Sequence, residues 1–381
     1  MTVTDGHSSD SDILGRSGVN DVDAIIDICA ANTDVDAVEH VVADTADAIF
    51  TWNYEKGERP KLEKLYEKAK TSQWNVETDL DWSTEVDPYE AFSIMTELGP
   101  ETGWTTDPDS PIYGWGDKEM REFSYESFSW RLSQFLHGEQ GALLCTAKIV
   151  ETVPFYDAKL YASTQVMDEA RHVEVFAKYL DEKVENTYPI NPHLRLLLDD
   201  IINDSRWDMT YLGMQIMVEG LALAAFGFMH GLTEEPLLKK LLRYVMSDEA
   251  RHVAFGVLSL QEVYSELSAA ELRERQEFAF EAAVRMRDRF LQQEVWERMG
   301  VPIKPMVDRI LDLPEEQKIF QAMLFSKIVP NIKKLGLLDA GDGWLRERFT
   351  EIGVIQFEDW TDTAEEYGDF SLEHEDVPKA G

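Results

Sequence analysis

The feature that most constrains this chain is a ten-residue segment that occurs twice. MDEARHVEVF spans 167–176 and SDEARHVAFG spans 247–256, and in each a Glu is followed three residues later by a His. This spacing places both side chains on one face of an α-helix, about a turn apart, where a carboxylate and an imidazole can reach the same ion. Another Glu lies 30 residues before each motif Glu, at Glu139 and Glu219. The chain therefore contains an internal duplication of helix, short connection and helix.

The two halves together supply four carboxylates and two imidazoles. We expect these candidate metal ligands to converge from four antiparallel helices: Glu139, Glu169, His172, Glu219, Glu249 and His252. Such a set suits two divalent ions such as iron or manganese, bridged by carboxylates. Without metal, mutual repulsion is expected to raise carboxylate pKa values and to make stability depend on metal. One DEARH segment alone would indicate a solvated charged helix face, but two copies in phase with upstream Glu residues favour a metal centre.

Charged residues beside the candidate ligands form a second set. Asp168 and Asp248 precede the motif Glu residues, and Arg171 and Arg251 precede the His residues. A carboxylate that accepts the outer N–H of a metal-binding His fixes its tautomer, and an Arg can hold that carboxylate. We therefore assign Asp168 and Asp248 a supporting role in catalysis.

The rest of the chain predicts an all-α fold. Residues 118–336 have the pattern of successive long helices with short connections, and helices of about 30 residues exceed the usual length and indicate a bundle. The predicted organisation is a disordered N-terminus at 1–20, a helical and loop extension at 21–117, a four-helix bundle with flanking helices at 118–336, and an acidic C-terminal tail at 337–381. The third helix of the bundle, predicted over 192–229, buries Glu219 on an apolar face, where a charge needs a partner or a metal.

Composition limits the possible partners. The formal net charge of −37 repels phosphate backbones and anionic lipid headgroups, so neither nucleic acid nor a membrane is expected as a partner. The most apolar stretch, 216–232, has 17 residues and contains Glu219 and His230, which makes it too short and too polar for a membrane span. No signal peptide is visible, and two cysteines cannot build a disulfide framework, so a cytoplasmic protein is expected. Acidic residues throughout the chain indicate adaptation to a saline cytoplasm.

At the duplicated motif the chain resembles the ferritin-like, carboxylate-bridged di-iron superfamily, over about residues 119–265. The Asp-Glu-x-Arg-His form is similar to bacterial multicomponent monooxygenase hydroxylases and to soluble acyl carrier protein desaturases. The segment YEKAKTSQWNVETDLDWS resembles the entry segment of class I ribonucleotide reductase small subunits. That likeness implies that Trp74 contacts Asp248 and passes electrons towards His172.

The resemblance also implies how the metals are held. Glu169 and Glu249 would bridge two iron ions, or one manganese and one iron, with Glu139 and His172 on one ion and Glu219 and His252 on the other. The reduced pair would react with O2 and oxidise a substrate or a protein side chain. Electrons would come from a ferredoxin or flavoprotein reductase, and the chain would form a homodimer.

Departures from these families limit the transfer of function. Phe176 stands where reductase small subunits have their radical tyrosine, and Leu223 stands where monooxygenases have a pocket threonine. Gln165 and Gln215, one turn before Glu169 and Glu219, could replace that threonine or could simply hydrogen-bond between helices. Apolar residues near the ligands could line a substrate pocket or could be core packing: Phe135, Leu143, Phe176, Leu223 and Phe226.

Three functions therefore remain after the sequence analysis. The chain could be an O2-activating oxidase or monooxygenase with an apolar small-molecule substrate. It could be a radical-generating subunit of a ribonucleotide reductase, or a ferritin-like iron oxidation and storage protein. Chain length and the terminal extensions disfavour storage, because a storage cage needs only a compact four-helix subunit.

Overall fold

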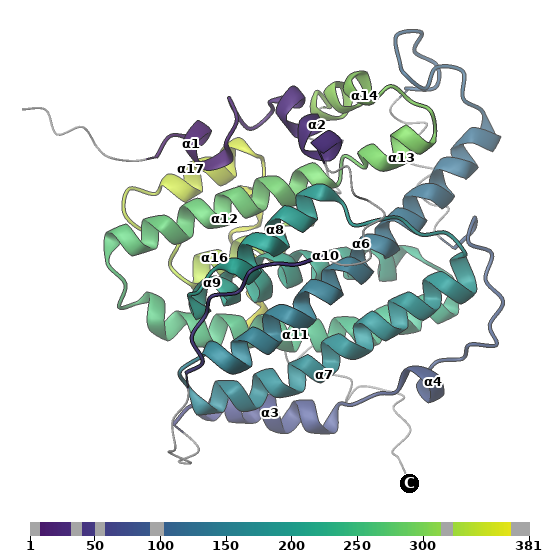
Figure 1. The fold of residues 1–381 in the computed structure, drawn as a ribbon. Helices are drawn as coiled ribbons and strands as arrows, with labels where there is room; N and C mark the ends of the chain where they lie inside the picture. The colour runs from purple at the N-terminus through teal and green to yellow at the C-terminus, as the bar shows by residue number, and fades with distance from the viewer. Residues whose placement is uncertain (1–7, 32–39, 50–57, 92–102, 314–322, 367–381) are drawn as a thin grey trace, which may run out of the picture.

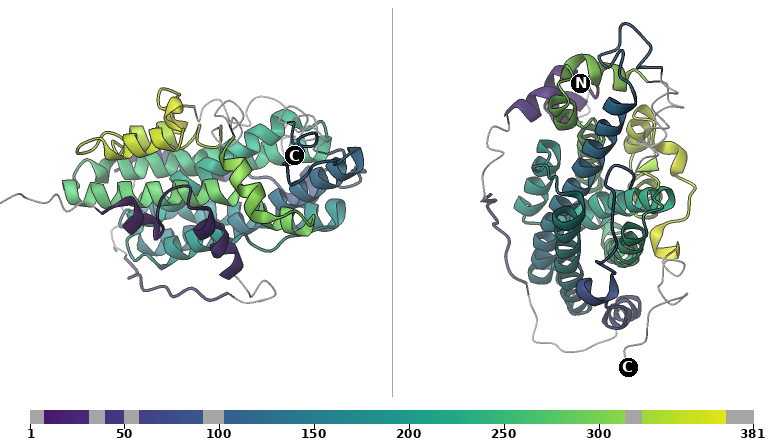
Figure 2. Two further views of the ribbon diagram at one scale, coloured as in Figure 1. Left: turned by 90° about the horizontal axis from the view of Figure 1, so that it is seen from above. Right: turned by 90° about the vertical axis from the view of Figure 1, so that its right-hand side faces the viewer.

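The computed structural model describes residues 8–31, 40–49, 58–91, 103–313 and 323–366. Over these residues it is helical without strands, which confirms the all-α prediction. Four helical segments form the core bundle: α6 (Asp117–Thr152), α7 (Tyr156–Tyr179), α9 to α10 (Trp207–Leu232) and α11 (Pro236–Tyr264). Figure 1 shows α6 and α7 side by side with α10 and α11 behind them, and Figure 2 gives two further views of the same bundle.

Two of the bundle helices contain wider π-helical turns. The run from Trp207 to Leu232 consists of α9 (Trp207–Tyr211), the π-helix η3 (Leu212–Val218) and α10 (Glu219–Leu232), and α7 continues into the π-helix η2 (Leu180–Val184). A π-turn inserts an extra residue and rotates the rest of the helix about its axis, and such turns are frequent at functional sites. In this chain η3 ends immediately before Glu219, so it sets the direction in which that carboxylate points.

Flanking helices cover the bundle. α3 lies along α7 and α11, and α8, α12 and α17 form a further layer at the opposite side (Figure 1). The bounds of the flanking elements are α1 Asp10–Leu14, α2 Val22–Ala31, α3 Pro60–Thr71, α4 Val76–Asp79, α8 Pro192–Asn203, α12 Ala269–Arg289, α13 Gln293–Arg298, α14 Ile303–Leu311, α16 Val329–Lys334, α17 Trp344–Glu351, η5 Ile355–Phe357 and α18 Thr363–Glu366.

Several predicted boundaries are confirmed and others differ. The helical region predicted from residue 118 begins with α6, which starts at Asp117. A capping box of Ser268 with Glu271 begins α12. The single helix predicted over 192–229 is instead interrupted between α8 and α9. Within the segment predicted to be disordered, Asp10–Leu14 form α1, and Arg16 forms a buried ion pair of 2.7 Å with Asp288; residues 1–7 lie outside the described residues.

The most apolar helical run lies inside the molecule. Trp207–Leu232 is long and apolar enough to cross a membrane by length and composition alone, but 78% of its most apolar window is buried against the rest of the structure. Burial of this kind is what the core helix of a soluble protein shows, as the sequence analysis predicted.

Candidate metal centre

The six predicted ligands lie together in the middle of the bundle. Glu139 comes from α6, Glu169 and His172 from α7, Glu219 from the start of α10, and Glu249 and His252 from α11. All six side chains are buried. Their ligand atoms form two groups in which every atom lies within 4.8 Å of the others: Glu139, Glu169, His172 and Glu249 in one, and Glu169, Glu219 and His252 in the other. Each group could hold one metal ion, and Glu169 is common to both.

The two motif carboxylates lie between the two imidazoles. His172 Nδ1 is 3.0 Å from Glu249 Oε1 and 3.4 Å from Glu169 Oε2. His252 Nδ1 is 3.1 Å from Glu169 Oε1 and 3.5 Å from Glu249 Oε2. Both Glu169 and Glu249 can therefore reach both halves of the centre, which is the position a bridging carboxylate requires.

The hydrogen bonding within this cluster is incomplete in a way that fits bound cations. Both carboxylate oxygens of Glu249 and one oxygen each of Glu169 and Glu219 are buried without a hydrogen-bond partner, as is His252 Nδ1. A buried acceptor without a partner is costly, and a buried carboxylate more so. Two divalent ions would satisfy these atoms and offset four negative charges, so the donor set fits a pair of hard to borderline metals.

The electrostatics of the cluster support the same conclusion. Burial and the neighbouring charge of Glu249 raise the pKa of Glu139 to about 8, and burial with the charge of Glu169 raises the pKa of Glu219 well above its usual value. Burial also opposes ionisation of Glu169, but the neighbouring His252 and His172 have the larger effect and lower the pKa of Glu169. The predicted rise in carboxyl pKa is therefore found at Glu139 and Glu219. At Glu169 the pKa is lowered instead, because Glu169 lies between two imidazoles.

The outer nitrogen of each imidazole is held by an Asp from the other half of the duplication. His172 Nε2 lies 3.2 Å from Asp248 Oδ2, and His252 Nε2 lies 3.3 Å from Asp168 Oδ2. Contacts of this kind leave Nδ1 as the metal-facing atom of each ring. The sequence identified the two Asp residues but could not show this crosswise pairing, which depends on how α7 and α11 pack.

Two buried arginines neutralise the two Asp residues. Arg171 and Arg251 each bond to both carboxylates: Arg251 Nη2 donates to Asp168 Oδ2 at 3.0 Å, and Arg171 Nη2 donates to Asp248 Oδ2 at 3.2 Å. Burial raises the pKa of Asp248, but Arg251 and His172 outweigh it and lower that pKa. Asp248 is therefore an ionised acceptor fixed in place.

Trp74 lies where the resemblance places it. It follows α3, is 5% exposed, and its Nε1 donates to Asp248 Oδ2 at 2.7 Å. Its ring stacks on Tyr244 with centroids 5.1 Å apart. Trp74, Asp248 and His172 thus form a continuous hydrogen-bonded chain from the edge of the bundle to the centre.

Polar and apolar side chains lie on opposite sides of the centre. On one side, Gln165 Nε2 donates to Glu169 Oε1 at 2.9 Å and to Glu219 Oε1 at 2.8 Å, whereas the amide of Gln215 is buried without a hydrogen-bond partner. Tyr161 lies beyond Gln165 and close enough to His252 to affect its charge. Tyr161 was not among the residues predicted from the sequence, although its position eight residues before Glu169, about two helical turns, places it on the same face of α7.

On the other side, three phenylalanines fill the space next to the centre. Phe135 contacts Phe226 and Phe176 with ring centroids 4.7 and 5.9 Å apart, and Phe176 stacks on Phe226 at 5.6 Å. Leu223 is buried, while Leu143 is partly exposed. In this structure the rings pack against one another as core.

Two further residues that are close to the ligands in sequence, His137 and Cys145, lie outside the centre. His137 Nε2 lies 2.9 Å from the carbonyl of Tyr188, so this ring points away from the ligands. Cys145 is fully buried, and burial raises the pKa of its thiol. Neither residue is therefore part of the two ligand groups.

Comparison with known proteins gives distant structural likenesses. No protein-family model and no curated protein matches the chain. Among solved structures, the chain is similar to an R2-like ligand-binding oxidase with an aerobically reconstituted metal cofactor after photoconversion, at 18% identity and a TM-score of 0.46, covering 73% of this chain and 93% of that one. It is also similar to an R2-like ligand-binding oxidase with an aerobically reconstituted Mn/Fe cofactor, at 17% identity and a TM-score of 0.41, covering 75% and 96%.

Proposed function

We propose that this protein is an O2-activating oxidoreductase with a pair of metal ions, two irons or one manganese and one iron. The observation that carries the proposal is the pair of buried ligand groups that share Glu169 and leave carboxylate oxygens without partners. When bound and reduced, such a metal pair supplies the electrons that reduce O2 and the oxidising power that acts on a substrate. Neutral packing residues at these positions would give a more stable bundle, so the buried charges favour a functional role.

The protein's own residues have separable roles in this proposal. The four Glu and two His hold the metals, and the crosswise Asp contacts orient the imidazoles. Gln165 fixes Glu169 and Glu219 relative to each other through its two bonds. The surrounding helices keep bulk water away, because all six ligands are buried.

We propose an apolar organic substrate, and the arrangement of side chains supports this. The phenylalanine cluster of Phe135, Phe176 and Phe226 lies on the side of the centre opposite Gln165 and Gln215. A substrate would have to displace at least one ring, because the rings occupy the space in this structure. Phe226→Ala is therefore expected to admit larger apolar molecules, as measured by mass spectrometry of ligands extracted from the purified protein.

Metal analysis is the direct test of the proposed centre. The wild-type chain should bind two metal ions and consume O2 in step with an added reductant such as ascorbate with a redox mediator. Glu169→Ala and His252→Ala should each lose at least one ion per chain, whereas the matched control His137→Ala should keep both. Unchanged metal content in the first two variants would refute the site assignment.

A second candidate is a radical-generating subunit like that of ribonucleotide reductase. The chain from Trp74 through Asp248 to His172 favours it, because this arrangement can carry an electron to the centre together with a proton shift. Phe176 in place of the usual tyrosine opposes it. Electron paramagnetic resonance after addition of iron and O2 separates the two, since a radical subunit should give a stable tyrosyl signal.

The proposal also includes partners that the centre would need. A ferredoxin or flavoprotein reductase would supply electrons, and the edge of the bundle near Trp74 is where we expect it to dock. We further propose a cytoplasmic homodimer formed through the outer face of α6 and α7.

A further inference from the structure

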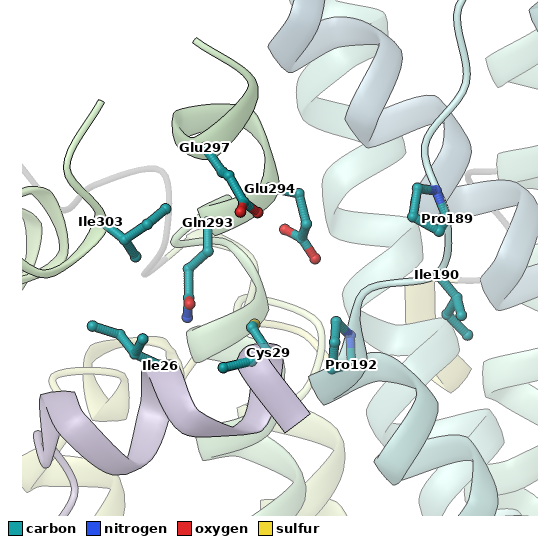
Figure 3. A pocket seen from close by; sticks show the side chains of 10 residues that line it. Ile26, Cys29, Pro189, Ile190, Pro192, Gln293, Glu294, Glu297 and Ile303 are labelled. Atoms are coloured by element: carbon teal, nitrogen blue, oxygen red, sulfur yellow. The ribbon is translucent and has the colours of Figure 1, made fainter. Parts of the chain in front are cut away.

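A cavity of about 310 Å³ lies between α2, α13 and the segment that leads into α8. None of the six metal ligands lines it. Figure 3 shows Cys29 on one side and Gln293, Glu294 and Glu297 on the other. The volume corresponds to about ten water-sized groups, which is enough for a small organic molecule.

The polar groups of this cavity are mainly acceptors. Glu294 and Glu297 lie one turn apart on α13 and both line the cavity. The side chains that donate to the Glu294 carboxylate are neutral, Asn191 Nδ2 at 2.6 Å and Trp130 Nε1 at 3.2 Å. Neither Glu forms an ion pair with a basic residue in the part of the chain that the structure describes; the adjacent Arg298 is engaged with Glu126 at 3.1 Å. The cavity is therefore lined by two acidic side chains: Glu297 is exposed, and burial raises the pKa of the partly buried Glu294 carboxyl.

The buried amide of Gln293 and the thiol of Cys29 are the other polar groups that line the cavity. Gln293 is 4% exposed and lines the cavity, and its Nε2 donates a long hydrogen bond of 3.5 Å to the carbonyl of Ile25. The Cys29 thiol lines the same cavity, and burial first and then the charges of Glu294, Asp288 and Glu297 raise its pKa. A cation placed here would contact acceptors from two helices.

The spacing of these groups disfavours a metal ion. Within the described residues, the clusters with ligand atoms within 4.8 Å of one another are the two at the bundle centre, and Cys29, Glu294 and Glu297 do not form another. The walls between the polar groups are apolar and come from Ile26, Ile190, Ile303, Pro189 and Pro192. An extended occupant with a charged end and an apolar body fits this lining better than a compact ion.

We propose that this cavity binds a small organic cation, an ammonium group on an apolar carbon skeleton. The ammonium lies between Glu294 and Glu297, and the skeleton packs against Ile26, Ile190 and Ile303. Charge complementarity supplies the specificity, because an ammonium donates three hydrogen bonds to the acceptors that face the cavity. This site is independent of the proposed metal centre.

The test uses the full chain and n-hexylammonium as the probe, with n-hexanol as its neutral counterpart. Isothermal titration calorimetry is carried out at the lowest salt concentration at which the chain is folded. Hexylammonium should bind saturably at one site with a Kd of about 1 mM or tighter, and hexanol should bind at least about tenfold more weakly.

Variants locate the site. Glu297→Gln should weaken hexylammonium binding about tenfold, and Ile303→Trp, which fills the cavity, should abolish it. Glu266→Gln is the matched control, because Glu266 is an exposed acid elsewhere on the surface and its loss removes the same charge. Metal content should stay unchanged in all three variants, which shows that the fold is intact and separates this test from that of the metal centre.

Three results would overturn the proposal. Equal binding of hexylammonium and hexanol would mean that the cavity recognises only apolar surface. Equal weakening by Glu297→Gln and Glu266→Gln would mean that general surface charge attracts the probe. Binding that persists in Ile303→Trp, or that never saturates, would place the probe outside the cavity.

Discussion

At the scale of single residues, Asp248 connects the two halves of the molecule. It lies on α11, yet it contacts His172 of α7 and accepts a hydrogen bond from Trp74, which follows α3. Its lowered pKa keeps it ionised, so it holds both donors at once. The orientation of His172 therefore depends on three separate segments of the chain, and a change at Trp74 should affect the centre without removing a ligand.

Trp74→Phe tests this dependence. The substitution removes the Nε1 donor and keeps an aromatic ring against Tyr244. Metal content should stay unchanged, the free energy of unfolding should fall by about 1–3 kcal/mol for the lost buried bond, and reduction of the loaded centre by an external donor should slow at least about tenfold. Stopped-flow absorbance of the reduction measures the rate. An unchanged rate would mean that electrons enter by another route.

Glu139 predicts how metal removal changes the response of the protein to pH. Its carboxyl has a pKa of about 8 in the metal-free fold, against an ordinary value of 4.5, so the folded state binds more protons than the unfolded state between these values. The pKa values of His172 and His252 are also raised, so above the ordinary histidine value of 6.5 these side chains likewise hold more protons in the folded state than in the unfolded state. This stabilisation is complete below pH 4.5 and is lost as pH rises towards 8. The melting temperature of metal-free protein should therefore fall from pH 5 to pH 8.

Metal should reverse this trend, because bound metal requires ionised carboxylates and neutral imidazoles, and its affinity rises with pH. Calorimetry of metal-free and metal-loaded protein should give melting temperatures that diverge as pH increases. In the metal-free state, Glu139→Gln should flatten the fall. Parallel curves for the two forms would contradict the assigned ligands.

At the scale of elements, the sequence predicted the bundle helices but not the break within 192–229. The break follows α8, where Lys148 of α6 inserts its amine and donates to the carbonyls of Ile202 and Asp204 at 2.5 and 2.6 Å. Asp204 Oδ1 also accepts from the backbone N–H of Arg206 at 2.9 Å, which competes with helical bonding. The Lys148 contact is long-range, so no local pattern could reveal it, whereas the Asp204 turn is a local feature that acts in the same direction. The metal ligands were predictable for the opposite reason, since their spacing is local and duplicated.

Close packing around the π-helix η3 gives a prediction for Gly256. A Cβ added at Gly256 of α11 would lie 2.5 Å from the Cβ of Gln215, an atom that cannot move without its backbone. Gly256→Ala should therefore lower the free energy of unfolding by about 1–3 kcal/mol and reduce metal content, because η3 leads directly into Glu219. Thermal unfolding and metal analysis measure both effects.

Gly227→Ala is the matched control on α10. A Cβ there would meet only the terminal methyl of Met246 at 3.5 Å, an ordinary contact. This variant should be neutral or gain up to about 1 kcal/mol from helix propensity. Equal effects of the two substitutions would mean that the approach of η3 to α11 does not limit stability.

At the scale of the whole molecule, one face stands out against the net charge of −37. Between residues 140 and 150 of α6 and between 160 and 170 of α7, every exposed or half-buried side chain is uncharged. Leu144 and Met167, on these two stretches, are 59% and 57% exposed. α6 and α7 lie side by side, so the stretches form one uncharged outer face (Figure 1).

We expect this face to pair with the same face of a second copy, because two strongly acidic chains can approach most closely where neither carries charge. Met167→Glu should convert the dimer to a monomer in sedimentation velocity experiments. Tyr113→Glu is the matched control, since Tyr113 is also 58% exposed but lies elsewhere, before α6, and it should leave the dimer intact. A wild-type chain that is monomeric in the same experiment would refute the proposed homodimer.

The remaining acidic residues give the last prediction, on salt. Of 73 Asp and Glu residues, six belong to the metal centre or its supporting contacts, and 67 are left to act mainly at the surface. Self-repulsion of such a surface opposes folding at low ionic strength, where the screening length is about 10 Å at 0.1 M salt, and weakens at 1 M, where it is about 3 Å. The free energy of unfolding should therefore rise steeply with potassium chloride up to molar concentrations, as circular dichroism at increasing salt would measure. Divalent metal at the centre should lower the salt that is needed, because it stabilises the folded state alone. A cooperative fold of equal stability in millimolar salt would show that the surface charge is not an adaptation to a saline cytoplasm.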